Sequence, residues 1–365
     1  MPDKLPRDTA EETRRSRAAA LLSEPKLDAF FISNPHNVRY LTGFTGSNGA
    51  LLLCKEGRAT FYTDPRYTVQ SRSQVSCRIT IAKGALTLAV LADIRRKSLK
   101  RVGFEQDDLT VSRFEAMKKE LPVRATLEPV SGVIEKLRMV KDEGEIERIR
   151  ASVVANSSAL ERALSRLKPG ITEAEFAAEI DYQNRKLGAE APAFDTIVAA
   201  GNRAALPHAH PGDAKIEPGM LLIDMGAFRE GYASDMTRMV HLGAASARYK
   251  KAYRAVLEAQ MAAVDRVRAG VRTTAVDRAA RAVLKTYGLD REFVHSTGHG
   301  LGLEIHETPR IGRRDKTRLE AGMAITIEPG VYIEGWGGIR IEDTVLVTAT
   351  GCEVLTPTTK DLREI

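Results

Sequence analysis

A passage with a helical pattern occurs twice in the second half of the chain, with the two copies starting a hundred residues apart. Arg166–Ala189 (RLKPGITEAEFAAEIDYQNRKLGA) and Arg266–Leu289 (RVRAGVRTTAVDRAARAVLKTYGL) share one outline. Each contains the end of a helix, a Gly at the break, a Thr as the expected cap, a second helix and a late Gly. Strand-like segments follow each copy. This repeat predicts two halves, helices followed by sheet, related by a pseudo-twofold axis.

The first half of the chain has a different pattern, in which short strand-like runs alternate with helices. We expect strands at Asp28–Ser33, Gly49–Cys54, Ala59–Thr63, Cys77–Ala82 and Arg101–Glu105, and helices at Thr9–Leu22, Leu88–Leu99 and Ser112–Leu121. Such alternation is typical of an α/β domain. The polar run Asn34–Gly49 is expected to be a loop. Long helices follow at Ile134–Val140 and Glu143–Leu167, so we predict one domain over residues 1–137 and another over residues 138–365.

Composition excludes several classes of protein. The chain has 365 residues, 43% of them hydrophobic, which is enough for two domains with buried cores. Its three cysteines are scattered, as in proteins of a reducing cytoplasm. The charged N-terminus lacks a signal-peptide pattern, and no apolar run approaches the roughly 18 residues of a membrane span. The net charge is +7, but the basic residues are interspersed with acidic ones, which indicates a solvated surface. We expect a cytoplasmic protein that binds neither membranes nor nucleic acid.

Two glutamates interrupt an apolar pattern near the end of the chain. Ala324–Val347 (AITIEPGVYIEGWGGIRIEDTVLV) predicts two strands joined by a Gly-rich turn, with Glu328 on the first strand and Glu342 on the second. An acidic residue in such a strand either faces solvent or is buried with a counter-charge. Taken alone, the pattern favours the surface.

Two aspartates lie in a second pair of apolar strands, Met220–Val240. A turn centred on Arg229-Glu230 would place Asp224 and Asp235 directly opposite each other, with Cβ atoms roughly 5 Å apart. Two carboxylates at that distance repel, unless one is protonated or a cation lies between them. The apolar neighbours of both aspartates disfavour a solvated face.

Three of the seven histidines fall within the run His295–Glu307 (HSTGHGLGLEIHE), namely His295, His299 and His306. The glycines do not open a helix inside a βαβ unit, so this run is not a dinucleotide-binding loop. The clustering of histidines beside Gly-rich backbone favours a functional site.

The acidic and imidazole groups together predict a metal centre. Its candidate ligands are Asp224, Asp235, His299, Glu328 and Glu342. Four carboxylates brought together without cations would each cost several kcal/mol in desolvation. Two divalent ions balance their charge, and an oxygen-rich site with one imidazole suits Mn²⁺, Co²⁺, Zn²⁺ or Fe²⁺. Such a pair of ions supports metal-assisted hydrolysis.

The motifs ID-x-G, SD-x-TR, G-H-G-x-G, T-I-E-P-G and R-I-E-D resemble those of the pita-bread metallopeptidases, specifically the Xaa-Pro branch with aminopeptidase P and prolidase. The likeness covers almost all of the chain. It is rich in motifs from about residue 138 onward and looser before that, where NVRYLTGF and TDPRY are similar to a creatinase-type domain. The resemblance implies an α/β (α+β) protein, with a creatinase-type N-terminal α/β domain followed by a pseudo-twofold pita-bread catalytic domain.

The resemblance also implies roles for single residues. The five candidate ligands match the family's dinuclear set, and Glu328 matches its general base as well. His208, His295 and His306 match the histidines that hold the scissile carbonyl and stabilise the oxyanion. Arg310, Tyr332 and Arg340 match substrate-binding positions. The register leaves His210 as an alternative to His208, and the preceding Pro207 favours His208.

The implied activity is hydrolysis of the bond between an N-terminal residue and proline by an Xaa-Pro aminopeptidase with two metal ions, Mn²⁺ first among the candidates. An Xaa-Pro dipeptidase (prolidase) with the same mechanism is the alternative, favoured by Arg310, which could meet a dipeptide carboxylate. More distant alternatives are another pita-bread hydrolase and a metal-free peptide-binding protein. The implied partners are peptides with proline in second position and a second copy of the chain in a homodimer.

Overall fold

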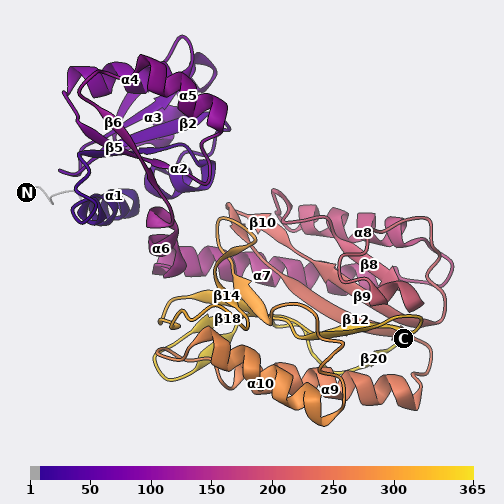
Figure 1. Ribbon diagram of the computed structural model, residues 1–365. Coiled ribbons are helices and arrows are strands. Elements are labelled where there is room, and N and C mark those ends of the chain that lie inside the picture. Colours follow the sequence, from indigo (N-terminus) through magenta and orange to yellow (C-terminus); the bar gives the residue numbers. More distant parts are fainter. Residues whose placement is uncertain (1–8) are drawn as a thin grey trace, which may run out of the picture. The chain divides into compact units, whose positions relative to one another are not determined.

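The computed structural model describes residues 9–365, so the first eight residues of the charged N-terminal run lie outside the described part. The chain forms two compact units, Met1–Arg138 and Met139–Ile365. Both are mixtures of helices and strands, as Figure 1 shows. Among the described residues, no helix combines the length and the apolar character needed to cross a membrane.

The N-terminal unit is built on a six-stranded sheet with the order β4-β3-β2-β1-β5-β6. Its strands are β1 (Ala29–Ile32), β2 (Gly49–Cys54), β3 (Ala59–Thr63), β4 (Arg78–Ile81), β5 (Arg101–Glu105) and β6 (Thr126–Val130). Its helices are α1 (Ala10–Leu21), α2 (Pro35–Thr42), α3 (Thr68–Gln74), α4 (Leu86–Arg96), α5 (Val111–Glu120) and α6 (Val133–Met139). The sequence pattern does not indicate β6, because Glu128 and Pro129 interrupt its alternation; proline is tolerated there because β6 is an edge strand.

Helix α2 corrects one expectation, because it occupies half of the predicted loop Asn34–Gly49. The Asn34 side chain caps the helix by accepting hydrogen bonds from the backbone N–H groups of His36 and Asn37. Pro35 occupies the first turn, and Gly43 ends the helix in the left-handed conformation, with φ of 75°. The polar residues of this run are therefore the cap and end signals of a short helix whose buried face includes Val38 and Leu41.

In the second unit, two helix pairs enclose the strands. Figure 1 shows α7 (Glu143–Leu164) and α8 (Glu173–Lys186) on one side of the strands and α9 (Ala247–Val264) and α10 (Thr273–Thr286) on the other. Helices α8 and α10, the second helices of the two repeated passages, each have 14 residues. Thr172 caps α8 as expected, together with Glu175. The equivalent expectation for α10 is wrong: Arg272 holds the cap position without a side-chain bond, while the Thr273 hydroxyl donates to the carbonyl of Asp315.

The strands of this unit form two main sheets, ordered β20-β12-β9-β8 and β14-β13-β15-β18-β19, with smaller sheets beside them. The strands are β7 (Ala191–Pro192), β8 (Ile197–Ala200), β9 (Gly219–Met225), β10 (Ala227–Arg229), β11 (Tyr232–Ala233), β12 (Met236–Leu242), β13 (Gly298–Gly300), β14 (Glu307–Ile311), β15 (Ala324–Ile327), β16 (Gly330–Ile333), β17 (Gly337–Arg340), β18 (Asp343–Val347), β19 (Cys352–Val354) and β20 (Arg363–Glu364). Each main sheet supplies two of the acidic residues: Asp224 lies within β9 and Asp235 just before β12, whereas Glu328 follows β15 and Glu342 precedes β18.

Candidate metal centre

The aspartates come from the antiparallel pair β9–β12. The pairs Met225↔Met236 and Asp224↔Thr237 show that the turn is Glu230-Gly231, one residue beyond the predicted centre. Both turn residues have positive φ (51° and 78°), as a two-residue type I′ hairpin turn requires. The prediction that Asp224 and Asp235 are directly opposed is therefore wrong. Asp224 faces Thr237, and Asp235 lies two residues before Thr237, just outside the strand.

The glutamates come from a second long hairpin, which has four short strands rather than the two predicted. The ladder pairs Ile327↔Asp343 and Gly330↔Arg340 flank a gap in the pairing. Glu328 and Glu342 therefore occupy facing positions in this gap, one just after β15 and the other just before β18. In this gap the N–H of Glu328 donates to the carbonyl of Thr297 and the N–H of Glu342 to that of Thr237. Both carboxylates line the same cavity as the two aspartates.

His299 lies at the centre of β13, between Gly298 and Gly300. A Cβ atom on Gly298 would lie 1.9 Å from the Thr326 carbonyl oxygen, so only glycine lets β13 approach β15 this closely. The Nδ1–H of His299 donates to the carbonyl of Gly300 at 3.0 Å, which leaves Nε2 with a free lone pair. Nε2 lies 3.5 Å from Asp235 Oδ2 and 3.4 Å from Glu328 Oε1. This is the tautomer and orientation that a metal-binding imidazole needs.

The cluster of candidate ligands is electrostatically unfavourable unless positive charge is added to it. Burial, reinforced by the neighbouring carboxylates, raises the pKa of Asp235 and of Glu342 well above their usual range. Burial raises the pKa of Glu328 to about 7, although the Arg340 guanidinium acts in the opposite direction. Burial also lowers the pKa of His299, which favours its neutral, ligating form.

The arrangement fits divalent cations. Ligand atoms of Asp235, His299 and Glu342 lie within 4.8 Å of one another. Asp224 Oδ1 is buried and has no hydrogen-bond partner among residues 9–365, although its other oxygen accepts from Arg340 at 2.6 Å. A buried carboxylate oxygen without a donor is costly unless a cation meets it. Oxygen donors with one imidazole suit the first-row ions expected from the sequence.

Two threonines that sequence reasoning missed hold the glutamates in place. Thr237 accepts from Arg340 Nε at 2.9 Å and donates to Glu342 Oε2 at 2.8 Å. Thr326 donates to Glu328 Oε1 at 3.2 Å. Their spacing is the signal that could have found them, because each lies two residues from a candidate ligand, and residues i and i+2 of a strand share a face.

Three predicted substrate residues form one directional chain of hydrogen bonds. Arg340 Nη1 donates to the Tyr332 hydroxyl at 2.5 Å, and this oxygen lies 2.9 Å from His295 Nε2. Because His295 Nδ1–H donates to the Ser296 carbonyl at 2.7 Å, Nε2 must accept from Tyr332 in the neutral ring. Burial lowers the pKa of His295 to about 4, so the ring is neutral at pH 7. In this arrangement His295 orients Tyr332 and Arg340 and has no N–H left for the cavity.

A single cavity of about 750 Å³ connects these groups. All five candidate ligands line it, together with His208, His210, His295, His306, Arg310 and Arg340. Tyr332 lies behind this lining, bonded to His295 and Arg340. His208, His306 and Arg310 are exposed, whereas Arg340 is buried. Phe194, Ile197 and Pro207 give the same cavity an apolar part.

The fold and this cluster define a metal-dependent peptidase. Residues 147–349 match the model of metallopeptidase family M24, and residues 14–140 match the Creatinase/Prolidase N-terminal domain. The chain belongs to family M24, in the branch of Xaa-Pro peptidases that its motifs indicated. The predicted family and two-part fold are confirmed.

The relatives and solved structures agree with this assignment. The chain is 37% identical to the Xaa-Pro dipeptidase of Pyrococcus furiosus over 96% of this chain and 99% of that protein. It is similar to the structure of an Xaa-Pro dipeptidase from Bacillus anthracis, with 39% identity, a TM-score of 0.94 and coverage of 97% and 100%. It is also similar to that of an X-Pro aminopeptidase from Thermotoga maritima, with 36% identity, a TM-score of 0.89 and coverage of 96% and 100%.

Proposed function

We propose that this protein is a metallo-exopeptidase that hydrolyses the bond between an N-terminal residue and proline, with Xaa-Pro dipeptides as its first substrate class. The observation that carries the proposal is the convergence of five candidate ligands on one cavity that also has an apolar part and an arginine, Arg310, in its wall. Asp224, Asp235, His299, Glu328 and Glu342 would hold two divalent ions, Mn²⁺ first among them. The ions would supply an activated water and polarise the scissile carbonyl.

The chain's own residues would bind the substrate and move its protons. Glu328 is placed to take a proton from the attacking water, because its carboxylate lines the cavity beside the other candidate ligands. His208 and His306 face the cavity and can donate to the oxygen that becomes negatively charged. Proline in second position makes the scissile bond a tertiary amide without an N–H, so an apolar slot suits it better than a hydrogen-bond acceptor. Phe194, Ile197 and Pro207 are available for that slot.

Arg310 supports the dipeptide as substrate. Its Nε donates to the Ser296 hydroxyl at 3.1 Å, which holds the guanidinium at the cavity wall. Its outer nitrogens can then form a planar fork for the carboxylate that follows proline in a dipeptide. An arginine placed for this purpose would lose its partner when the chain continues beyond proline.

A second cavity favours longer peptides as the second candidate. It has a volume of about 810 Å³ and shares His295, Ser296 and Arg310 with the first cavity. Arg313 and Arg314 also line it, and neither has an ion-pair partner in the described part of the chain. The second cavity therefore adjoins the first at Arg310 and has mainly basic surroundings, where the carboxylate of a tripeptide or tetrapeptide could be bound. This adjoining basic cavity is the structural support for the aminopeptidase hypothesis.

The test is a substrate panel with the metal-free protein reconstituted separately with Mn²⁺, Co²⁺ and Zn²⁺. Xaa-Pro and Xaa-Pro-Xaa-Xaa peptides are compared with Xaa-Ala controls. Arg310→Ala should raise KM for the dipeptide, while the control Arg313→Ala should affect only the longer peptide. Equal cleavage of Xaa-Ala and Xaa-Pro would contradict the proposal. The homodimer that the resemblance implies and the cytoplasmic location that the composition predicts also remain proposals; sedimentation of the purified protein tests the first.

A further inference from the structure

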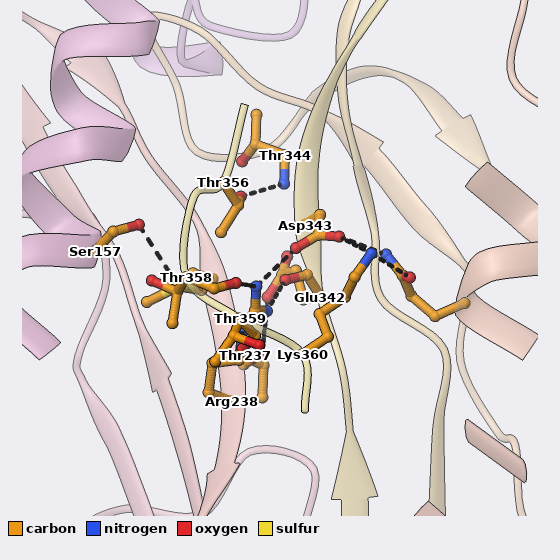
Figure 2. Close-up of polar contacts among 12 residues, drawn as sticks. Ser157, Thr237, Arg238, Glu342, Asp343, Thr344, Thr356, Thr358, Thr359 and Lys360 are labelled. Atoms are coloured by element: carbon orange, nitrogen blue, oxygen red, sulfur yellow. Dashed lines mark hydrogen bonds and ion pairs between the residues drawn. The ribbon is translucent and has the colours of Figure 1, made fainter. Parts of the chain in front are cut away.

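A buried polar cluster lies behind the metal centre, on the side away from the cavity lining. Figure 2 shows Arg238 of β12, Asp343 of β18 and Lys360 meeting beside residues 356–360, the segment between β19 and β20. Arg238 is 4% exposed and Asp343 is fully buried. Burying such charges is favourable only when their hydrogen bonds are complete.

Arg238 uses all five of its N–H groups. Nε donates to the carbonyl of Thr359 at 3.0 Å, and Nη2 donates to the carbonyl of Thr358 at 2.7 Å and to Asp343 Oδ1 at 2.8 Å. Nη1 donates to the carbonyls of Thr237 and Glu342. The guanidinium thus joins residues 358–359 to two residues of the metal centre. A lysine could not reproduce this planar set of contacts.

Asp343 is equally well satisfied from the other side. Its Oδ2 accepts from Lys360 Nζ at 2.7 Å and from the buried Gln260 Nε2 at 2.9 Å. Lys360 Nζ also donates to Gln260 Oε1 at 3.0 Å. Two cations, Arg238 and Lys360, therefore surround one carboxylate, so both oxygens of Asp343 have charged hydrogen-bond donors that fix its position.

The cluster is connected to the candidate ligands through the backbone. Glu342 lies where the β15–β18 ladder is interrupted, and Arg238 takes its carbonyl group in place of a strand partner. Thr344, the residue after Asp343, donates its hydroxyl to the carbonyl of Asp235 at 3.1 Å and its N–H to Thr356 at 3.0 Å. The segment 356–360 thus supports the backbone of two candidate ligands, although none of its residues lines the cavity.

We propose that Arg238, Asp343 and Lys360 form a clamp by which residues 356–360 set the position of Glu342, and that Lys360 is a positioning residue of the metal centre. The inference rests on the proposed metal site and goes beyond it, because it assigns a role to a segment outside the cavity. Groups that orient metal ligands from behind typically change metal affinity about 10- to 100-fold when they are removed.

The experiment compares Lys360→Met with Lys250→Met. Both lysines attach the C-terminal part of the chain by an ion pair, Lys360 to Asp343 and Lys250 to Glu364, but only the first pair contacts the clamp. Lys360→Met should weaken Mn²⁺ binding about 10-fold in calorimetry. It should also change the visible absorption of the Co²⁺-loaded protein and lower kcat with KM unchanged. Lys360→Arg should restore most of the affinity, and Lys250→Met should match the wild type in all three measurements.

Tyr253→Phe gives a milder test should Lys360→Met fail to fold. The Tyr253 hydroxyl donates to the carbonyl of Lys360 at 2.9 Å, so its loss should loosen the segment and weaken Mn²⁺ binding about two- to threefold. Wild-type Mn²⁺ affinity and Co²⁺ spectrum in folded Lys360→Met would overturn the clamp but leave the proposed function intact. A wild-type protein that binds no divalent ion would overturn both.

Discussion

Each of the two units contains a buried glutamate whose pKa is raised to about 7, mainly by burial, yet the two side chains differ in what surrounds them. Glu105 in the N-terminal unit accepts from the N–H groups of Ser33 and Asn34, both at 2.7 Å, and from Asn37 Nδ2 at 2.6 Å. Glu328 in the catalytic unit accepts one bond, from Thr326, and otherwise faces carboxylates, His299 and a cavity. A raised pKa alone therefore does not identify a functional site. A buried carboxylate that lacks hydrogen-bond donors and lies among other carboxylates does.

The largest effect should come from removing the cations that the carboxylate cluster around Glu328 requires. Treatment with a chelator should abolish activity and lower the melting temperature, because ions bound only to the folded state stabilise it by about 2.7 kcal/mol at a hundred times their Kd. Asp235→Ala and Glu342→Ala should behave like the chelated protein in calorimetry and in peptide cleavage. The matched change in the other unit, Glu105→Ala, should leave metal binding unchanged. Full activity in a verified metal-free sample would show that the cluster around Glu328 does not need cations for catalysis.

The next effect separates two histidines that the resemblance groups together. His306→Ala should lower kcat about 10²-fold with metal content unchanged, as the loss of one oxyanion donor does. His295→Ala should instead act as Tyr332→Phe does, because both interrupt the chain that leads to Arg340. Steady-state kinetics and metal analysis of the three variants provide the measurement. If His295→Ala and Tyr332→Phe differ by more than about tenfold in kcat, the assignment of His295 to the hydrogen-bond chain with Tyr332 and Arg340 is wrong.

A smaller effect concerns the pH dependence of stability in the N-terminal unit. Because the pKa of Glu105 is raised on folding, the folded state holds the proton more tightly, and stability should fall as pH rises from about 4.5 to about 7. The expected loss is about 2–3 kcal/mol. Glu105→Gln cannot ionise, so the stability of the variant relative to wild type should rise over this range. Denaturant unfolding at pH 5, 6, 7 and 8 measures it, with exposed Glu115→Gln as control. Parallel pH profiles for wild type and Glu105→Gln would rule out this assignment.

The smallest effect tests the local structure that holds Glu105. Asn34→Ala removes the side-chain cap of α2 but keeps the backbone N–H that Glu105 accepts. The free energy of unfolding should fall by about 1 kcal/mol. Asn34→Asp should retain most of the wild-type stability, since aspartate also caps helices well. Both variants should keep wild-type kcat; a loss of activity in Asn34→Ala would indicate that this unit takes part in catalysis.

Parts of the fold were predictable because their signals are local. The alternating segments of the first half and the repeated helices of the second were readable from runs of a dozen residues or so. Helix α2 was missed because its cap and end residues, Asn34 and Gly43, are also the residues of loops. The turn at Glu230-Gly231 was misplaced by one residue because several residues near it tolerate turns, and only the ladder selects the register.

The sequence by itself determined the family, the two-part fold and the set of candidate ligands, because each candidate lies in a short motif with its own spacing. Only the tertiary structure decided how these residues are held. The contact of Arg238 with Glu342 joins residues 104 positions apart, and that with Thr358 joins residues 120 apart. His295 Nδ1–H donates to the Ser296 carbonyl, and this bond makes Nε2 an acceptor. The bond depends on a backbone conformation that no sequence motif specifies. Such contacts follow from packing of distant segments, and packing has no short-range sequence signal.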